Sequence, residues 1–165
     1  MADAHHPSAP ERSGRWKAEV LRQAIADAGL RPEDIDAVIA HASSTPKGDT
    51  AEIRAINAVY VTERTASPPP VVSLKGHIGH PGAAAGAMGL ITSVLGMADG
   101  TLPHTAGTRY LDAEIDFDVI LDRPRSAGLA HRRDQRSRLR WAERFADRAT
   151  HLSRSIAFTR PTEGA

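Results

Sequence analysis

The sequence of 165 residues contains no cysteine, only three lysines and few aromatic residues, which make up 4% of the chain. Without cysteine there are no disulfides, no thiolate metal ligands and no cysteine nucleophile. The length fits a single domain whose core is built mainly from alanine, valine, isoleucine and leucine. The first residues carry no basic segment followed by an apolar run, and no stretch approaches about 18 continuous apolar residues. The sequence therefore predicts neither a signal peptide nor a membrane span, and it favours a cytoplasmic location.

The charge is distributed unevenly along the chain. Residues 1–122 hold 10 Lys or Arg against 16 Asp or Glu, whereas residues 123–165 hold 11 arginines, no lysine and 4 acidic residues. A basic tail is typical of segments that bind nucleic acid or another anionic surface. A nucleic-acid binder is therefore one hypothesis.

The hydrophobic pattern predicts alternating helices and strands. Helices are expected over residues 13–29, 49–60 and 82–97, and strands over residues 37–40, 71–74 and 113–121. Ser13 and Asp49 are the expected N-caps of the first two helices, with Glu52 three residues after Asp49. Gly29 is the expected stop of the first helix. This order is typical of an α/β layer fold.

Two of the predicted strands end in polar loops, at His41 and near Lys75. The carboxyl ends of strands are where α/β sheets bind ligands. His80 precedes the third predicted helix, whose dipole favours a neutral ring that donates to a developing oxyanion. Because His41 ends another strand, a two-histidine oxyanion site is one hypothesis. A zinc site made of His41, His77 and His80 is a second, and histidines at positions 77 and 80 that merely hold a tight loop are a third.

Two motifs carry a resemblance to a known family. The first runs His41-Ala-Ser-Ser-Thr45-Pro-Lys-Gly-Asp49 and continues to Glu52. The second runs Lys75-Gly-His-Ile-Gly79-His80, followed by glycines and alanines up to residue 86. Together with DGTLPHT at residues 99–105, these motifs resemble the C-terminal half of β-ketoacyl-acyl carrier protein synthases, which are condensing enzymes of the thiolase fold. The likeness covers residues 2–125.

The resemblance implies a fold, a reaction and a site. The fold is expected to be one C-terminal half of the αβαβα layered thiolase architecture, with residues 1–125 as the synthase domain. The family is an acyltransferase family that performs a decarboxylative Claisen condensation of a malonyl-carrier thioester with an acyl thioester, in fatty acid or polyketide biosynthesis. Motif position implies catalytic roles for His41, Lys75 and His80 and supporting roles for Glu52, Asp49, Thr45 and Gly79.

Partners also follow from the resemblance. Acyl carrier protein, which holds the substrates on phosphopantetheine, is the expected partner, and the family-typical assembly is a homodimer or heterodimer. No cofactor, metal, nucleic acid or membrane is expected. Lys75 is expected to order the site through its charge and to pair with Glu52.

The sequence departs from the family pattern in three ways. Ala42 stands where the motif has glycine, so the loop is strained if this position needs a positive φ. Gly76 replaces a serine. The family's nucleophile is a cysteine in an N-terminal half that has no counterpart here, so the chain alone is not expected to complete condensation. A truncated synthase is the leading hypothesis, and a non-catalytic module that binds carrier protein or a synthase partner is the alternative.

Residues 126–165 do not resemble the family, whose chain continues into the core-sheet motif Asn-Ser-Phe-Gly-Phe-Gly-Gly. Back-translation of RLRWAERFA, residues 138–146, read one nucleotide later permits Gly-Phe-Gly-Gly-Gln-Asn-Ala-Ser, with one glycine forced by the tryptophan codon. The tail is therefore interpreted as an out-of-frame reading that is non-native or disordered, and the last core strands are expected to be missing. This interpretation explains the arginine content without a nucleic-acid partner.

The gene, read one nucleotide later across codons 134–146, is expected to encode a Gly-Phe-Gly-Gly-like motif, and the upstream sequence is expected to encode a cysteine-bearing half. The reason is the codon compatibility described above. Sequencing the gene with its flanks is the measurement. Codons that give other residues at the three free positions of the motif would contradict the frame-shift interpretation.

Overall fold

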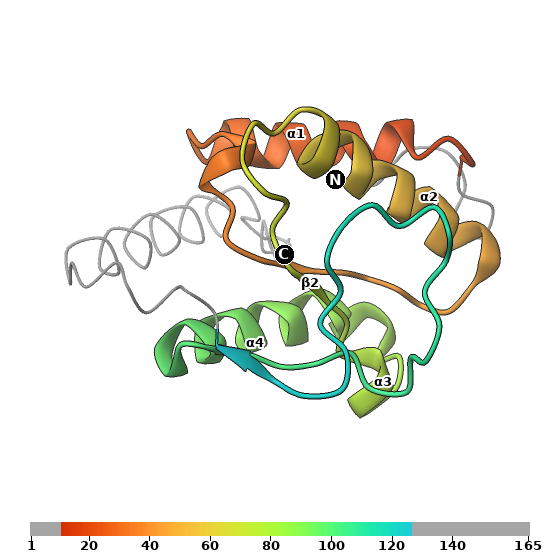
Figure 1. Ribbon diagram of the computed structural model, residues 1–165, viewed down its shortest axis with the longest axis vertical. Helices are drawn as coiled ribbons and strands as arrows, with labels where there is room; N and C mark the ends of the chain where they lie inside the picture. Colours follow the sequence, from red (N-terminus) through yellow and green to blue (C-terminus); the bar gives the residue numbers. More distant parts are fainter. Residues whose placement is uncertain (1–10, 127–165) are drawn as a thin grey trace, which may run out of the picture. The chain divides into compact units, whose positions relative to one another are not determined.

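The part of the chain that the structure describes, residues 11–126 of a computed structural model, is an assembly of helices around short strands (Figure 1). In chain order the elements are α1 (Arg15–Asp27), η1 (Pro32–Asp34), β1 (Val38–Ile39), α2 (Pro46–Ile56), η2 (Asn57–Thr62), β2 (Val71–Val72), α3 (Lys75–Ile78), η3 (Gly82–Ala84), α4 (Ala85–Asp99), β3 (Thr101–Leu102) and β4 (Arg125–Ser126). Figure 1 shows α1 and α2 on one side of β2 and α4 on the other. The α/β layering predicted from the sequence is present in these residues.

The strands form two small sheets. β1 and β2 are parallel, with Val38 opposite Val71 and Ile39 opposite Val72. On the other edge of β2, Val71 forms a parallel bridge with Val119. β3 and β4 form an antiparallel pair. Because β1 and β2 run in the same direction, their carboxyl ends lie together, and the loops that follow them meet at one edge.

The main core lies between α1, α2, η2 and β2. Its buried side chains are Ala18, Ile25, Ala55, Ile56, Val59, Tyr60 and Val71. Burial of each larger aliphatic side chain stabilises the fold by about 1.5–3 kcal/mol. Gly14 allows α1 to approach α2 closely, because a Cβ at this position would lie 2.3 Å from the carbonyl oxygen of Ala51.

The first helix follows its prediction closely. It spans Arg15–Asp27, and Gly29 after it has a φ of 67°, as expected for the residue that ends a helix. The predicted N-cap was wrong by one residue. Gly14 is the N-cap, with a φ of 74°, and the Ser13 hydroxyl accepts the N–H of Arg15 at 3.2 Å.

The second helix begins one turn earlier than predicted. It starts at Pro46, after Thr45 as N-cap, so the prediction that Asp49 caps it was wrong. The physical reason is that proline already has a helical φ and favours the first helical position. Glu52, the expected partner in the cap, is bonded elsewhere, as described below.

A regular strand over residues 113–121 is not formed, and the bridge at Val119 is its only ladder contact among the described residues. Side chains of α2 and η2 hold this segment as a loop instead. Arg54 pairs with Glu114 at 2.7 Å, and the Asn57 amide donates to the Glu114 carbonyl at 2.6 Å. The Asn57 bond occupies a main-chain carbonyl that a strand partner would otherwise take.

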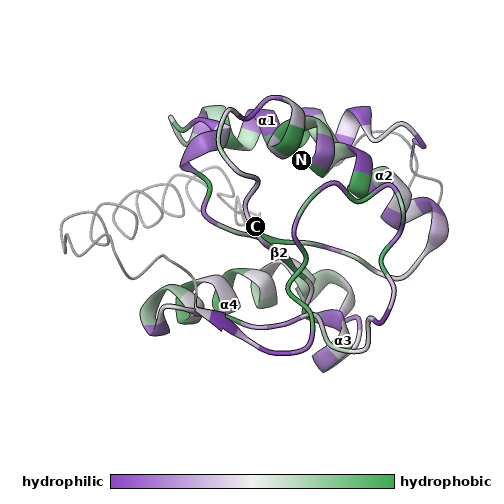
Figure 2. Ribbon diagram, in the orientation of Figure 1, coloured by the Kyte–Doolittle hydropathy of each residue, from purple (hydrophilic) through white to green (hydrophobic). Residues whose placement is uncertain are grey.

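Helix α4 is apolar and largely exposed. With the preceding turn it forms the segment Gly82–Asp99, which by length and composition alone is able to cross a membrane. Gly96 is its only buried residue, whereas Ile91, Val94 and Leu95 are each about half exposed. Figure 2 shows the hydrophobic colour along α4, in contrast to the more polar α1. A helix that is apolar on all sides is also typical of the interior of a larger protein.

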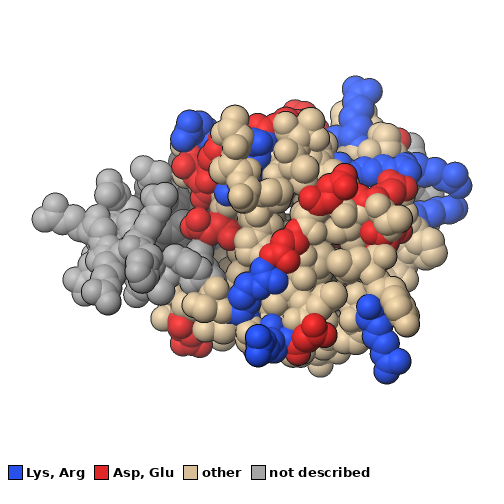
Figure 3. Space-filling model, in the orientation of Figure 1, with Lys and Arg blue, Asp and Glu red and all other residues tan. Residues whose placement is uncertain are grey.

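The charged side chains of the described residues are mixed in sign. On the face drawn in Figure 3, Lys and Arg side chains lie among Asp and Glu side chains instead of forming one positive patch. Several are paired, such as Arg22 with Glu63 at 2.6 Å. Residues 127–165, which hold nine of the tail's eleven arginines and carry the nucleic-acid hypothesis and the frame-shift interpretation, lie outside the described residues.

The exposed apolar face of α4 is expected to make the isolated chain self-associate, and replacing Leu95 by glutamate is expected to reduce this self-association. Leu95 is 58% exposed, so the substitution interrupts an apolar surface without opening a cavity, and the unfolding free energy should change by only about 0.5 kcal/mol. Sedimentation velocity and denaturant unfolding measure the two effects. Leu102→Ala is the control, since Leu102 is 2% exposed and its truncation should cost about 2–5 kcal/mol. Unchanged association of Leu95→Glu would contradict this view of α4.

Candidate active site

The parallel β1–β2 pair brings three of the predicted site residues together. His41 follows β1, Lys75 begins α3 directly after β2, and His80 lies between α3 and η3. The imidazole rings of His41 and His80 are 5.0 Å apart between centroids and meet edge to face at 77°. His41 and Lys75, which are 34 positions apart in the sequence, are in direct contact. The two sequence motifs thus lie next to each other at the carboxyl ends of β1 and β2.

The main chain at His41 is held from both sides by charged groups. The Glu52 carboxylate accepts the N–H of His41 and the N–H of Ala42, each at 2.7 Å. The Lys75 ammonium donates to the carbonyl oxygen of His41. The expected direct pairing of Lys75 with Glu52 is therefore replaced by a connection through the His41 backbone, and no ion pair between the two occurs among residues 11–126.

The loop after His41 has an unusual backbone. Ala42 has a φ of 35° and Ser44 a φ of 61°, and both values lie in the left-handed region that favours glycine. The strain expected from the replacement of the motif glycine by Ala42 is thus confirmed. Gly79, on the other motif, has a φ of 74° and a ψ of −174°, a combination that is essentially restricted to glycine.

A backbone hydrogen bond fixes the tautomer of His80. The N–H of Gly82 donates to Nδ1 of His80 at 3.0 Å. Because Nδ1 is the acceptor, the ring proton is on Nε2. His80 therefore presents an Nε2–H donor, as the hypothesis of a two-histidine oxyanion site requires.

The pKa of His41 lies below the ordinary value for an imidazole. Desolvation is the largest cause, and the Lys75 ammonium is the next, while the Glu52 carboxylate acts in the opposite direction. Since the pKa is lowered, the ring gains its proton only at a more acid pH than a free histidine and is neutral at pH 7. The pKa of Lys75 is also lowered, by its own burial.

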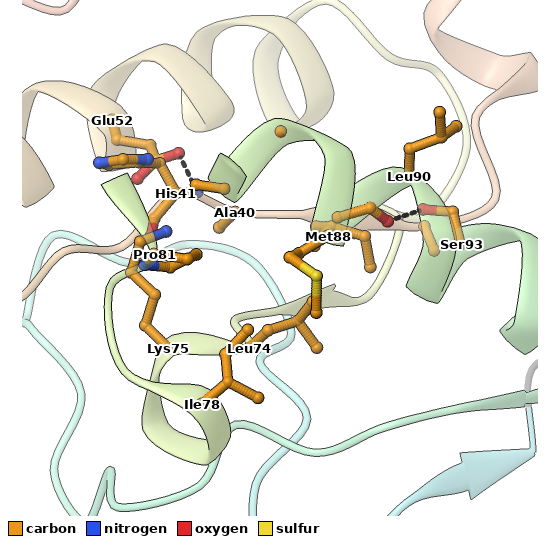
Figure 4. A pocket seen from close by; sticks show the side chains of 15 residues that line it. Ala40, His41, Glu52, Leu74, Lys75, Ile78, Pro81, Met88, Leu90 and Ser93 are labelled. Carbon is orange, nitrogen blue, oxygen red and sulfur yellow. Dashed lines mark hydrogen bonds between the residues drawn. The ribbon is translucent and has the colours of Figure 1, made fainter. Parts of the chain in front are cut away.

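His41 and Lys75 line a pocket of about 470 Å³ with an apolar continuation. Figure 4 shows His41, Glu52 and Lys75 at one end of the pocket and Met88 and Leu90 toward the other. The α4 residues in this lining belong to the same helix whose outer face is exposed. A second hollow of about 780 Å³ contains His80 and lies against α2 and residues 105–119. The charged groups thus stand where two hollows adjoin.

The segment after β3 holds α3 in place. His77 Nε2 lies 2.7 Å from the carbonyl oxygen of His104, and the two rings are in edge contact. A Cβ on Gly76 would lie 1.9 Å from the carbonyl oxygen of Ala106, so serine does not fit here without movement of the loop. The sequence analysis noted only that Gly76 replaces a serine. The departure from serine was the signal for this close approach, and it was missed.

The remaining predicted site residues, Thr45 and Asp49, lie at the start of α2. Thr45 caps α2, and its hydroxyl lies 3.1 Å from that of Ser43. Asp49 is in the first turn of α2, and its charge raises the pKa of Lys75 without a direct bond. Among residues 11–126, no group of three possible metal ligands occurs, because His77 is turned toward His104 and not toward the other two histidines.

The sequence of this chain is similar to those of known proteins. Residues 1–109 match the family model described as the C-terminal domain of β-ketoacyl synthase. The chain is 39% identical over 124 residues to 3-oxoacyl-[acyl-carrier-protein] synthase 2 of Mycobacterium leprae, a match that covers 75% of this chain and 29% of the relative. The chain therefore spans less than a third of the length of that curated relative.

Solved structures give the same picture of the fold. The ishigamide ketosynthase/chain length factor is similar with a TM-score of 0.67 and 37% identity, over 76% of this chain and 30% of the other. A type II ketosynthase in complex with its acyl-carrier protein is similar with a TM-score of 0.69 and 28% identity, over the same shares of the two chains. Both are ketosynthases, so the thiolase-like fold predicted from the sequence is confirmed.

Replacing Lys75 by methionine is expected to raise the pKa of His41. The substitution removes both the ammonium that disfavours the imidazolium and the donor that holds the His41 carbonyl. NMR titration of the His41 ring protons measures the pKa. Lys47→Met is the control, since Lys47 is exposed and is not among the charges that lower this pKa. A pKa of His41 that stays constant or falls in Lys75→Met would show that the two groups are not close in solution.

Proposed function

Since the chain belongs to the β-ketoacyl synthase family, matching its C-terminal domain, we propose that it supplies the histidine and lysine part of a decarboxylative condensation site. The substrate class is a malonyl thioester carried on phosphopantetheine. The observation that carries this proposal is the contact of two imidazoles whose centroids lie 5.0 Å apart, one of which has its proton fixed on Nε2.

The proposed chemistry follows from two N–H donors on one side of a thioester. In decarboxylation the bond between the malonyl α-carbon and its carboxylate carbon breaks, carbon dioxide leaves, and the electron pair forms an enolate. The enolate oxygen accepts hydrogen bonds from His41 and His80. Neutral donors suit this task, because they stabilise the developing oxyanion without giving up a proton to it. The enolate carbon then attacks the carbonyl of an acyl thioester, and the thiolate leaves.

The acyl thioester has to be held by another segment, because this chain has no cysteine. We assign that role to a segment equivalent to the rest of the relatives' length. Its contact surface is proposed to be the exposed face of α4, around Ile91, Val94 and Leu95. Other α4 residues, Met88, Gly89 and Ser93, line the pocket that contains His41, so a segment packed on α4 lies next to a wall of the site.

Acyl carrier protein is the proposed substrate carrier. Support comes from the similar type II ketosynthase, which was solved in complex with its acyl-carrier protein. A homodimer or heterodimer is the proposed assembly, by the family resemblance. No cofactor is required for the chemistry written above.

His80→Ala is expected to lower malonyl decarboxylation by about 100- to 1000-fold, the usual loss for one oxyanion donor, while acylation of the cysteine stays within a few-fold of normal. The test uses a chimera in which residues 2–125 replace the matching segment of the Mycobacterium leprae synthase. Release of carbon dioxide and mass-spectrometric detection of the acyl-enzyme measure the two half-reactions.

His77→Ala is the matched control for this experiment. Its ring lies on α3 close to His80 in sequence but is directed to the His104 carbonyl, so decarboxylation should be retained. Loss of acylation with normal decarboxylation in His80→Ala would contradict the assigned role. A chimera that binds carrier protein but performs neither half-reaction would favour the non-catalytic binding module instead.

A further inference from the structure

We propose that Glu52 is a positioning residue whose carboxylate occupies an anion nest formed by the main chain of His41 and Ala42, and thereby allows a non-glycine residue at position 42. The importance of Glu52 for catalysis rests on the proposed function. The contacts of Glu52 with the main chain do not depend on the proposed function, because they involve only residues of this chain.

The contacts define the nest. Two successive N–H groups, from His41 and Ala42, converge on the two oxygens of one carboxylate at 2.7 Å each. Successive amides point to a common anion when the backbone alternates between right- and left-handed or similar conformations. Here the anion is a side chain from α2, eleven residues further along the chain. Charge-assisted hydrogen bonds of this length are among the stronger ones in proteins.

The strain at Ala42 needs such a restraint. A φ of 35° is unfavourable for a residue with a Cβ, and nothing in the covalent structure of alanine holds it there. If the carboxylate were removed, the peptide between His41 and Ala42 would be free to rotate to a negative φ. The His41 ring would then leave its place beside His80 and Lys75.

Removing the Glu52 carboxylate charge has two effects on the pKa of His41, and they have opposite signs. This difference makes the proposal testable. The groups that act on the His41 ring are Lys75, Glu52, His80 and, more weakly, Lys17. Loss of the Glu52 charge alone should lower the pKa of His41, since that charge raises it. Movement of the His41 ring out of its present position should raise the pKa of His41 instead, because the ring moves away from the Lys75 ammonium and becomes more hydrated.

The experiment compares Glu52→Gln, Ala42→Gly and the double variant in the full chain, with Leu95→Glu as background if the chain self-associates. The readout is the pKa of His41 from NMR titration. Glu52→Gln is expected to raise it toward the ordinary imidazole value, and adding Ala42→Gly should lower it again, because glycine adopts the same φ without strain. Glu19→Gln, on the exposed surface of α1, is the control and should leave the pKa unchanged.

A second readout is a denaturant double-mutant cycle. The increase in the unfolding constant caused by Glu52→Gln should be smaller by roughly fivefold with glycine at position 42 than with alanine. A single variant that does not fold while the double variant does also supports the proposal. A lower pKa of His41 in Glu52→Gln, or additive effects in the cycle, would overturn it. Neither measurement contains substrate, so failure of the proposed function leaves this result unaffected.

Discussion

The His41 peptide, held between the carboxylate of Glu52 and the ammonium of Lys75, is the interaction on which the rest of the site depends. It joins three elements that are far apart in the sequence: the residue after β1 supplies the peptide, α2 supplies the carboxylate and α3 supplies the lysine. Each charged group is satisfied by a main-chain dipole and not by the opposite charge. The Lys75 ammonium therefore lies beside the neutral His41 ring without forming an ion pair with a carboxylate of the described residues.

The helical layer on the α4 side of this centre is exposed. One wall of the His41 pocket comes from a helix whose outer face is exposed and uncharged. On the other side of the sheet, α1 and α2 bury their apolar faces against each other and against β2. This difference between the two helical layers supports the proposal that another segment packs on the α4 side.

Much of this architecture could be predicted from the sequence, because it depends on local patterns. The amphipathic first helix, its stop at Gly29 and the parallel strands at residues 38–39 and 71–72 follow from periodicity and glycine chemistry. The motifs also located His41 and His80 correctly as neighbours in the fold. What could not be predicted depends on tertiary contacts. Glu52 bonds to a loop instead of capping its helix, and Arg54 and Asn57 hold Glu114, near the start of the predicted strand, by side-chain bonds.

The contact between Gly76 and the Ala106 carbonyl has a consequence for how this sequence can change. A serine at position 76 would place its Cβ 1.9 Å from that oxygen, so the residue that the family motif carries is blocked here unless the loop after β3 moves first. The order of substitutions therefore matters at this site. A change that shifts the main chain around residue 106 has to come before the serine, and the identity of one residue is tied to the path of a segment thirty positions further along the chain.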